Sequence, residues 1–230
     1  MPKLVLFDID ETMVSSHGAG RRALERAMSA VLNQEISLEG HSLSGKTDPQ
    51  ICFEALASYG LEKPAIQSRL QDIFEQYLPA LEDEVVRSAE FRVHDGVVDL
   101  LEILRTREDA FLGLLTGNIE QGAHVKLKRF GLHSYFAMGA YGSDSHDRME
   151  LPAVAHKRAS ELFRQDFSPG ELVIIGDARN DVLCAKGYGA RSIAVCTGKT
   201  TKQVLAELEP DYLFDSLASI GQVVDAIFAK

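Results

Sequence analysis

Short apolar runs alternate with amphipathic stretches along most of this chain, and this alternation restricts its fold more than any other feature. Each amphipathic stretch repeats its apolar residues at i, i+3, i+4 and i+7, which is typical of a helix with one buried face. The apolar runs predict strands at Lys3–Phe7, Ala110–Leu115, Tyr135–Ala140, Leu172–Ile175, Ser192–Val195 and Tyr212–Phe214. Strands that alternate with helices favour the α/β class with a parallel sheet.

One region lacks the alternation and predicts helices alone. Between residues 15 and 89, three apolar stripes recur at helical spacing, at Ala19/Ala23/Ala27/Val31, Ile51/Ala55/Tyr59 and Ile66/Leu70/Phe74/Leu78. We therefore expect an all-helical domain at 15–89, inserted into an α/β core made of residues 1–14 and 90–230.

Composition excludes several classes of protein. Of the 230 residues, 45% are hydrophobic and 25% are charged, the usual balance of a soluble globular chain. A net charge of −10 does not suit nucleic acid or an anionic membrane. No apolar run approaches the ~18 residues that span a bilayer, and the first residues do not resemble a signal peptide. We expect a cytoplasmic protein with no nucleic-acid or membrane partner, in which an anionic substrate needs local positive charge.

Acidic, hydroxyl and amide side chains follow three of the predicted strands. They are Asp8, Asp10 and Thr12 after the first, Thr116 and Asn118 after the second, and Asp177 and Asp181 after the third. In an open parallel sheet, the carboxyl ends of the strands form the ligand site. Crowded carboxylates repel one another unless a cation lies among them, and oxygen ligands suit Mg²⁺. A Mg²⁺ site in turn suggests a phosphorylated substrate.

These segments resemble the motifs of one enzyme family. Asp8-Ile-Asp10-Glu-Thr12 resembles the first motif of the haloacid dehalogenase (HAD) superfamily. Leu115-Thr116-Gly117-Asn118 resembles the second motif, and Gly176-Asp177-Ala-Arg-Asn-Asp181 resembles the fourth. The resemblance covers nearly the whole chain and implies a Rossmann-like parallel sheet with an inserted helical cap. The size and position of the cap are similar to those of phosphoglycolate phosphatase-like members.

The resemblance also implies the roles of two aspartates. Asp8 would be the nucleophile that forms an aspartyl-phosphate. Asp10 would protonate the leaving alcohol and then activate the hydrolytic water. Dehalogenases of the superfamily lack the second aspartate, because a halide leaving group needs no proton. Asp10 therefore points to a phosphatase or a phosphotransferase.

A metal site and a phosphate site are implied in the same way. The Mg²⁺ ligands would be the Asp8 carboxylate, the Asp10 main-chain carbonyl and Asp177, with Asp181 in support. Phosphate oxygens would be bound by Thr116 and by its neighbours Gly117 and Asn118. Thr12 would help to hold the loop after the first strand.

The chain departs from the family pattern at two positions. The third motif is normally a phosphate-binding Lys, and here Arg148 is the best candidate, with Lys157 as its rival. Lys157 would lie about two and a half turns into the next helix, pointing away from the site. Glu11 stands where the family very often has Gly, so we expect a turn that a non-glycine residue can adopt.

The cap loop at Leu43–Pro49 is the cap segment expected to reach the active site. Lys46 in this loop would contact an anionic substrate tail, or else remain a solvated lysine beside an ordinary helix cap.

Taken together, these features predict a Mg²⁺-dependent hydrolase of a small phosphomonoester, with phosphoglycolate as the leading substrate. Three alternatives stay open: a phosphosugar mutase of the same fold, a phosphonate-cleaving enzyme with Lys46 as its Schiff base, and a binding protein on this fold.

Overall fold

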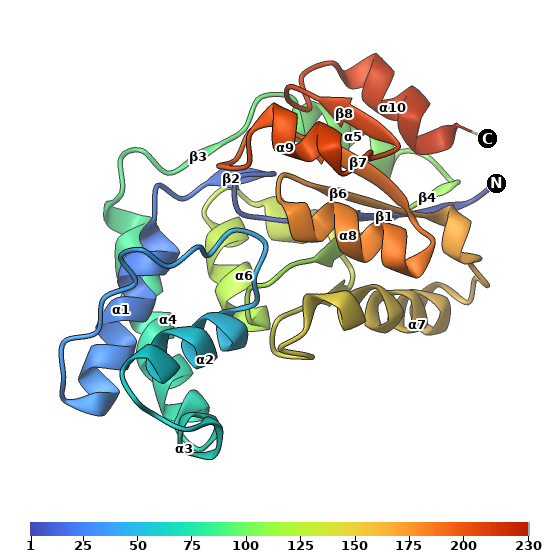
Figure 1. The fold of residues 1–230 in the computed structure, drawn as a ribbon. Helices are drawn as coiled ribbons and strands as arrows, with labels where there is room; N and C mark the ends of the chain where they lie inside the picture. Colours follow the sequence, from blue (N-terminus) through green and yellow to red (C-terminus); the bar gives the residue numbers. More distant parts are fainter. Residues whose placement is uncertain (230) are drawn as a thin grey trace.

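The computed structural model describes residues 1–229, and its centre is a six-stranded parallel sheet (Figure 1). The strand order is β5-β4-β1-β6-β7-β8, and every neighbouring pair is parallel. The strands are β1 (Lys3–Phe7), β4 (Ala110–Leu115), β5 (Gly139–Ala140), β6 (Leu172–Gly176), β7 (Arg191–Val195) and β8 (Tyr212–Phe214). The predicted α/β class is therefore confirmed, and β1 lies at the middle of the sheet.

Helices cover both faces of the sheet because alternate residues of each strand point to opposite sides. Val5 and Phe7 of β1 pack into one hydrophobic cluster, together with α5 (Val97–Arg105), α6 (Glu120–Lys128) and α10 (Ile220–Phe228). Leu4 and Leu6 pack into another, with α7 (Leu151–Phe163) and α8 (Arg179–Tyr188). A short α9 (Lys202–Glu207) lies against α8 and β7. Burial on both faces explains why the strands read as continuous apolar runs.

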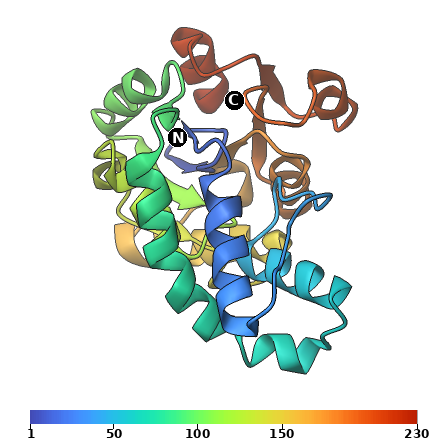
Figure 2. The same cartoon turned by 90° about the vertical axis from the view of Figure 1, so that its left-hand side faces the viewer.

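Between β1 and α5 the chain forms a separate group of helices, α1 (Ala19–Leu32), α2 (Asp48–Ser58), α3 (Lys63–Gln67) and α4 (Leu70–Arg87). The long helices α1 and α4 lie side by side (Figure 2). A two-stranded antiparallel sheet of β2 (Val14–Ser15) and β3 (Arg92–Val93) joins the group to the rest of the chain. We propose that this helical group is the cap at residues 15–89, placed at the carboxyl ends of the strands. No helix within the described residues is long and apolar enough to cross a membrane.

Two local predictions differ from the structure. The strand expected at Tyr135–Ala140 is reduced to Gly139–Ala140, and a 3₁₀ turn at Leu132–Tyr135 precedes it. The stripe from Ile66 to Leu78 belongs to two helices, α3 and α4. The break follows because the Ala65 carbonyl accepts hydrogen bonds from the Ser68 hydroxyl and the Arg69 guanidinium. Such side-chain bonds compete with the helical ladder and end the first helix.

The two faces of α5 provide a test of the packing. Leu101 is completely buried, whereas Ile103 on the same helix is 40% exposed. We expect Leu101→Ala to lower the free energy of unfolding by about 2–5 kcal/mol, because it leaves a cavity in the core. Ile103→Ala, the matched control, should change it by less than about 1 kcal/mol. Urea unfolding followed by circular dichroism measures both, and equal effects would contradict the assignment of the buried face.

Candidate active site

Three carboxylates meet at the carboxyl ends of the central strands. Asp8 follows β1, Asp177 follows β6, and Asp181 lies in the first turn of α8. Each offers one oxygen, and the three oxygens all lie within 4.8 Å of one another. All three residues are buried, and the Thr12 hydroxyl donates a hydrogen bond of 3.0 Å to Asp177. The structure thus brings together four of the residues that the sequence placed at this edge.

Burial and mutual repulsion disfavour ionisation of this cluster. Burial raises the pKa of Asp8 to about 6, with Asp181 and Asp10 contributing and Arg148 opposing. The pKa of Asp177 lies well above its usual value, because burial acts together with the charges of Asp181 and Asp8. A bound cation would remove this penalty, so the cluster is electrostatically prepared for one.

Arg148 is the cation that lies among these carboxylates. It is 2% exposed, its Nη2 atom lies 3.1 Å from Asp8 Oδ1, and it also forms an ion pair with Asp181. Lys157, by contrast, is exposed on α7 and does not line the cavity described below. Of the two candidates for the third motif, the structure therefore places only Arg148 against the predicted nucleophile.

The residues present fit a divalent cation. Three carboxylates face one guanidinium, which leaves two uncompensated negative charges in a buried site when all three are ionised. The donors are all oxygen atoms, as Mg²⁺ prefers. Asp8, Asp177 and Asp181 could hold such an ion. The expected contribution of the Asp10 main-chain carbonyl stays a prediction.

The side chain of Asp10 belongs to a second, separate network. The Lys126 ammonium lies 2.6 Å and 2.8 Å from its two carboxylate oxygens. Asn118 Nδ2 donates to Asp10 at 2.8 Å, and the Ser16 hydroxyl donates at 3.2 Å. Burial would raise the pKa of Asp10, but the Lys126 charge and these hydrogen bonds hold it below its usual value. Asp8 and Asp10, two residues apart, therefore have pKa values shifted in opposite directions.

Lys126 is the site residue that the sequence interpretation missed. It lies on α6 and is only 3% exposed. A signal was present, because Lys126 falls on the same helical stripe as Ile119, Ala123 and Phe130. A lysine on the apolar face of a helix that follows a motif of the site needs a buried partner.

The loop that follows β4 lies directly against the helical group. Thr116 is fully buried and its hydroxyl accepts a hydrogen bond of 2.8 Å from Asn118 Nδ2. Gly117 packs so closely on the Lys46 carbonyl that a β-carbon would overlap it. The Asp48 amide donates to the Gly117 carbonyl at 2.7 Å. The second motif is therefore also the docking point for the cap loop.

Three further hydrogen bonds attach the cap loop to the sheet edge. Asp48 Oδ2 accepts from the Ile119 amide at 2.9 Å, and so caps the start of α6 from outside the helix. The Thr47 hydroxyl donates to the His146 carbonyl at 2.8 Å. Asn180 donates to the Gly45 carbonyl at 2.8 Å. The loop thus contacts segments that follow three different strands.

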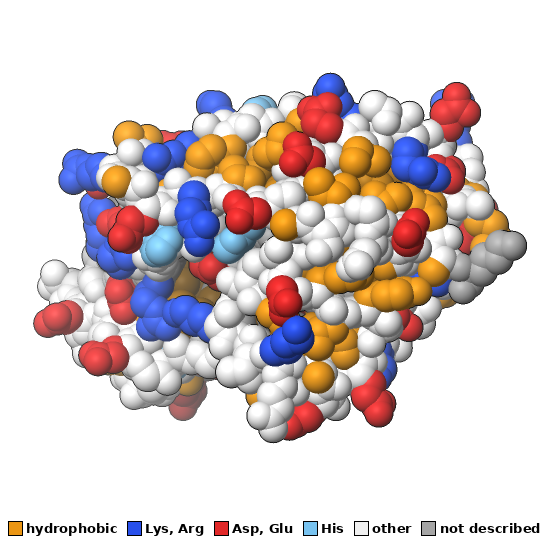
Figure 3. Space-filling view, turned by 90° about the horizontal axis from the view of Figure 1, so that it is seen from above, with side chains coloured by type: hydrophobic (Ala, Val, Ile, Leu, Met, Phe, Trp, Pro, Cys, Tyr) orange, Lys and Arg blue, Asp and Glu red, His pale blue; other side chains and the backbone are white. Residues whose placement is uncertain are grey.

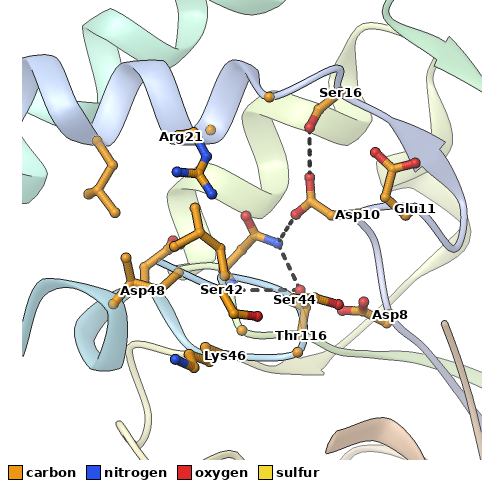
Figure 4. A pocket seen from close by; sticks show the side chains of 18 of the residues that line it. Asp8, Asp10, Glu11, Ser16, Arg21, Ser42, Ser44, Lys46, Asp48 and Thr116 are labelled. Atoms are coloured by element: carbon orange, nitrogen blue, oxygen red, sulfur yellow. Dashed lines mark hydrogen bonds between the residues drawn. The ribbon is translucent and has the colours of Figure 1, made fainter. Parts of the chain in front are cut away.

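A cavity of about 280 Å³ lies between the cap loop and the strand ends, and Asp8, Asp10 and Thr116 line it (Figure 4). Arg148 lines the same cavity. Cationic residues also line it, namely Arg21, Lys46 and Lys199. Figure 3 shows Lys, Arg and His side chains gathered around a hollow at the left of the molecule. This volume suits a small anionic metabolite.

Two of these cations already have partners. Lys46 forms an ion pair with Glu54, and Arg21 donates hydrogen bonds to the Leu38 and His41 carbonyls. Lys46 therefore lines the cavity, but its ammonium is engaged by a residue of its own helical group.

The turn after Asp10 is not the one expected for a non-glycine residue. Glu11 has φ of 60°, in the left-handed region that favours glycine. The Glu11 amide donates to the Val14 carbonyl at 2.7 Å, and the Ser15 hydroxyl donates to its side chain at 3.1 Å. These bonds offset a strain on the order of 1 kcal/mol.

The buried Asp48 provides a test based on pH. Burial raises the pKa of Asp48 to about 6, although Lys126 and the Ile119 amide oppose the shift. Between pH 4 and 6 the folded protein then holds a proton that the unfolded chain releases, so ionisation of Asp48 destabilises the fold as pH rises. Relative to Asp48→Asn, which cannot titrate, the wild type should lose on the order of 2 kcal/mol across this range. Urea unfolding of both proteins at pH 4, 5 and 6 measures the difference. A constant difference would contradict the raised pKa.

Comparisons with known proteins identify the family of the chain. The family model of haloacid dehalogenase-like hydrolases matches residues 2–189 of the 230. A phosphoglycolate phosphatase from Synechococcus elongatus is 31% identical over 137 residues, 59% of this chain and 60% of that protein. The phosphoglycolate phosphatase of Vibrio vulnificus (strain CMCP6) is 25% identical over 225 residues, 96% of each chain.

A solved structure has the same fold. CbbY from Rhodobacter sphaeroides, in complex with phosphate, superposes with a TM-score of 0.73 at 23% identity, covering 96% of this chain and 97% of that one. At this identity the similarity shows the fold alone. The family match, however, extends over most of the chain and includes every strand-end motif described above. The chain therefore belongs to the haloacid dehalogenase-like hydrolase family.

Proposed function

We propose that this hydrolase is a Mg²⁺-dependent phosphatase that cleaves a small phosphomonoester through an aspartyl-phosphate on Asp8. The observation that supports the proposal most is the placement of Asp8. Its carboxylate faces a cavity of about 280 Å³, within 4.8 Å of Asp177 and Asp181 oxygens and 3.1 Å from Arg148. Relatives named phosphoglycolate phosphatases make phosphoglycolate the first substrate to test.

In the first step, an Asp8 oxygen attacks phosphorus and the bond from phosphorus to the ester oxygen breaks. The ester oxygen keeps the bonding electrons and takes a proton from Asp10. Because Lys126 keeps the pKa of Asp10 low in the free protein, Asp10 would take up that proton when the monoanionic phosphate ester binds. In the second step, water attacks the phosphorus of the aspartyl-phosphate while the Asp10 carboxylate accepts its proton. The bond between Asp8 and phosphorus then breaks, which releases phosphate and restores both carboxyl groups.

The remaining groups bind and orient the phosphoryl group. Arg148 carries a permanent positive charge beside Asp8 and offers N–H donors to phosphate oxygens. Thr116, Gly117 and Asn118 also line the cavity, where the Thr116 hydroxyl and the Gly117 N–H group would donate to phosphate oxygens. The Asn118 N–H group donates to the Thr116 hydroxyl at 3.3 Å and helps to hold this loop. When bound at the carboxylates, Mg²⁺ would neutralise charge that develops on the transferring phosphoryl group.

The state of Lys46 bears on the phosphonate alternative. A Schiff-base lysine needs a neutral, accessible amine, whereas Lys46 is ion-paired with Glu54. This contact favours phosphomonoester hydrolysis over phosphonate cleavage. For Lys46 to bind the substrate, its ammonium would have to exchange Glu54 for the substrate anion.

Removal of the nucleophile tests the proposed reaction. We expect phosphate release from phosphoglycolate, or from another member of a panel of phosphorylated metabolites, to require Mg²⁺ and to stop on addition of EDTA. Asp8→Asn should lower kcat by at least about 10³-fold, because an amide oxygen is a poor nucleophile. Malachite-green detection of phosphate measures both effects. Unchanged turnover by the Asp8→Asn variant would contradict the proposal.

The third-motif assignment has its own test. Arg148→Ala should lower kcat/KM by about 10²-fold or more, since it removes the charge beside Asp8. Lys157→Ala, on the exposed face of α7, should match the wild type. If Arg148→Ala were as active as the wild type at saturating Mg²⁺, the assignment would be wrong.

A further inference from the structure

The Lys126 ammonium is saturated by two side chains of the site. Its three N–H donors match three short contacts, two to the Asp10 carboxylate and one of 2.6 Å to Asn118 Oδ1. The residue is also only 3% exposed. Lys126 lines the cavity, but it has no donor left for a substrate atom.

The fold makes room for this ammonium. Lys126 lies two turns into α6, whose first turn is capped by Asp48. Across from it, α1 carries Gly20, where a β-carbon would lie 3.2 Å from Lys126 Nζ. Glycine inside a helix is destabilising relative to alanine. Here it allows α1 to approach the ammonium closely.

The ion pair between Lys126 and Asp10 defines the position of the Asp10 carboxyl group. An unpaired ammonium at this depth is strongly unfavourable, so Lys126 and Asp10 keep each other in place. Asn118 bridges the pair to Thr116, because its amide group donates both to Asp10 and to the Thr116 hydroxyl at 2.8 Å. In Figure 4, Asp10 lies between Ser16 and the Thr116 end of the cavity.

We propose that Lys126 is a positioning residue, which holds the Asp10 carboxyl group where Asp10 can donate a proton to the departing ester oxygen. The proposal rests on the phosphatase function given above. The proton moves from Asp10 to the ester oxygen as the bond to phosphorus breaks, and Lys126 keeps its own protons throughout. Lys126 acts through Asp10 and does not contact the substrate.

Leaving groups that differ in their need for a proton test this role. An alkoxide must be protonated as it leaves, whereas p-nitrophenolate is stable as an anion. The quantity to compare is kcat/KM, which covers the steps up to departure of the leaving group. Lys126→Met should lower kcat/KM for the best alkyl phosphate of the panel by about 10–100-fold, and for p-nitrophenyl phosphate by less than about 5-fold. Lys128→Met, at an exposed lysine of the same helix, is the matched control and should affect neither substrate.

A double variant shows whether Lys126 works through Asp10. Asp10→Asn should show the same discrimination between the two substrates. Adding Lys126→Met to Asp10→Asn should then change kcat/KM by less than about 3-fold, as expected for two residues that act as one unit. A full additional loss in the double variant would overturn the proposal, as would equal losses for both substrates in Lys126→Met.

The two levels of the argument can fail separately. If Asp10→Asn lowered kcat/KM for both substrates equally, the acid role of Asp10 in the proposed function would be wrong. If Asp10→Asn lowered kcat/KM more for the alkyl phosphate than for p-nitrophenyl phosphate, and Lys126→Met lowered both equally, only the role of Lys126 would be wrong.

Gly20→Ala provides a second variant that retains the lysine. Its methyl group should displace the ammonium slightly without removing it, and alanine should favour the helix. We expect Gly20→Ala to lower kcat/KM for the alkyl phosphate about 2–5-fold more than kcat/KM for p-nitrophenyl phosphate, in a protein at least as stable as the wild type. If Lys126→Met did not fold, Gly20→Ala would decide. The proposal would be overturned if the ratio of kcat/KM for the alkyl phosphate to kcat/KM for p-nitrophenyl phosphate were the same in Gly20→Ala as in the wild type.

Discussion

The structure depends above all on the crowding of carboxylates at the buried ends of its central strands. Asp8, Asp177 and Asp181 lie within reach of one ion, in a place from which water is largely excluded. Like charges at this distance repel strongly at low dielectric, so the arrangement needs positive charge beside it. Arg148 supplies part of that charge, and a divalent cation would supply the rest.

The same constraint explains how two neighbouring aspartates differ. Asp8 shares one guanidinium with another carboxylate, and its pKa is raised to about 6, first by burial. Asp10 pairs with the Lys126 ammonium, whose third contact is the uncharged amide oxygen of Asn118, and the pKa of Asp10 is lowered. Environments that separate the pKa values of two close carboxyl groups are typical of sites in which the two play different parts. Here the separation follows from which cation reaches which side chain.

Much of this could be predicted from the sequence, because it depends on short-range patterns. The apolar runs located five strands to within a residue at each end, and the polar residues after them located Asp8, Thr116 and Asp177. The helical break near Ser68 and the left-handed Glu11 were missed for an equally local reason. A few local hydrogen bonds hold each of them, and a hydrophobic pattern carries no information about such bonds.

The sequence by itself determined the α/β class, the helical insertion after the first strand and the acidic residues at the strand ends. Tertiary structure alone decided which cationic side chain pairs with which carboxylate, and which residues of the sheet edge the cap loop contacts. Lys126 lies 116 positions from Asp10 along the chain, and Asp48 lies 71 positions from Ile119. Periodicity shows that such a residue faces the interior. Only the way in which α2 and α6 pack against the loops after β1 and β4 determines which partner it meets there.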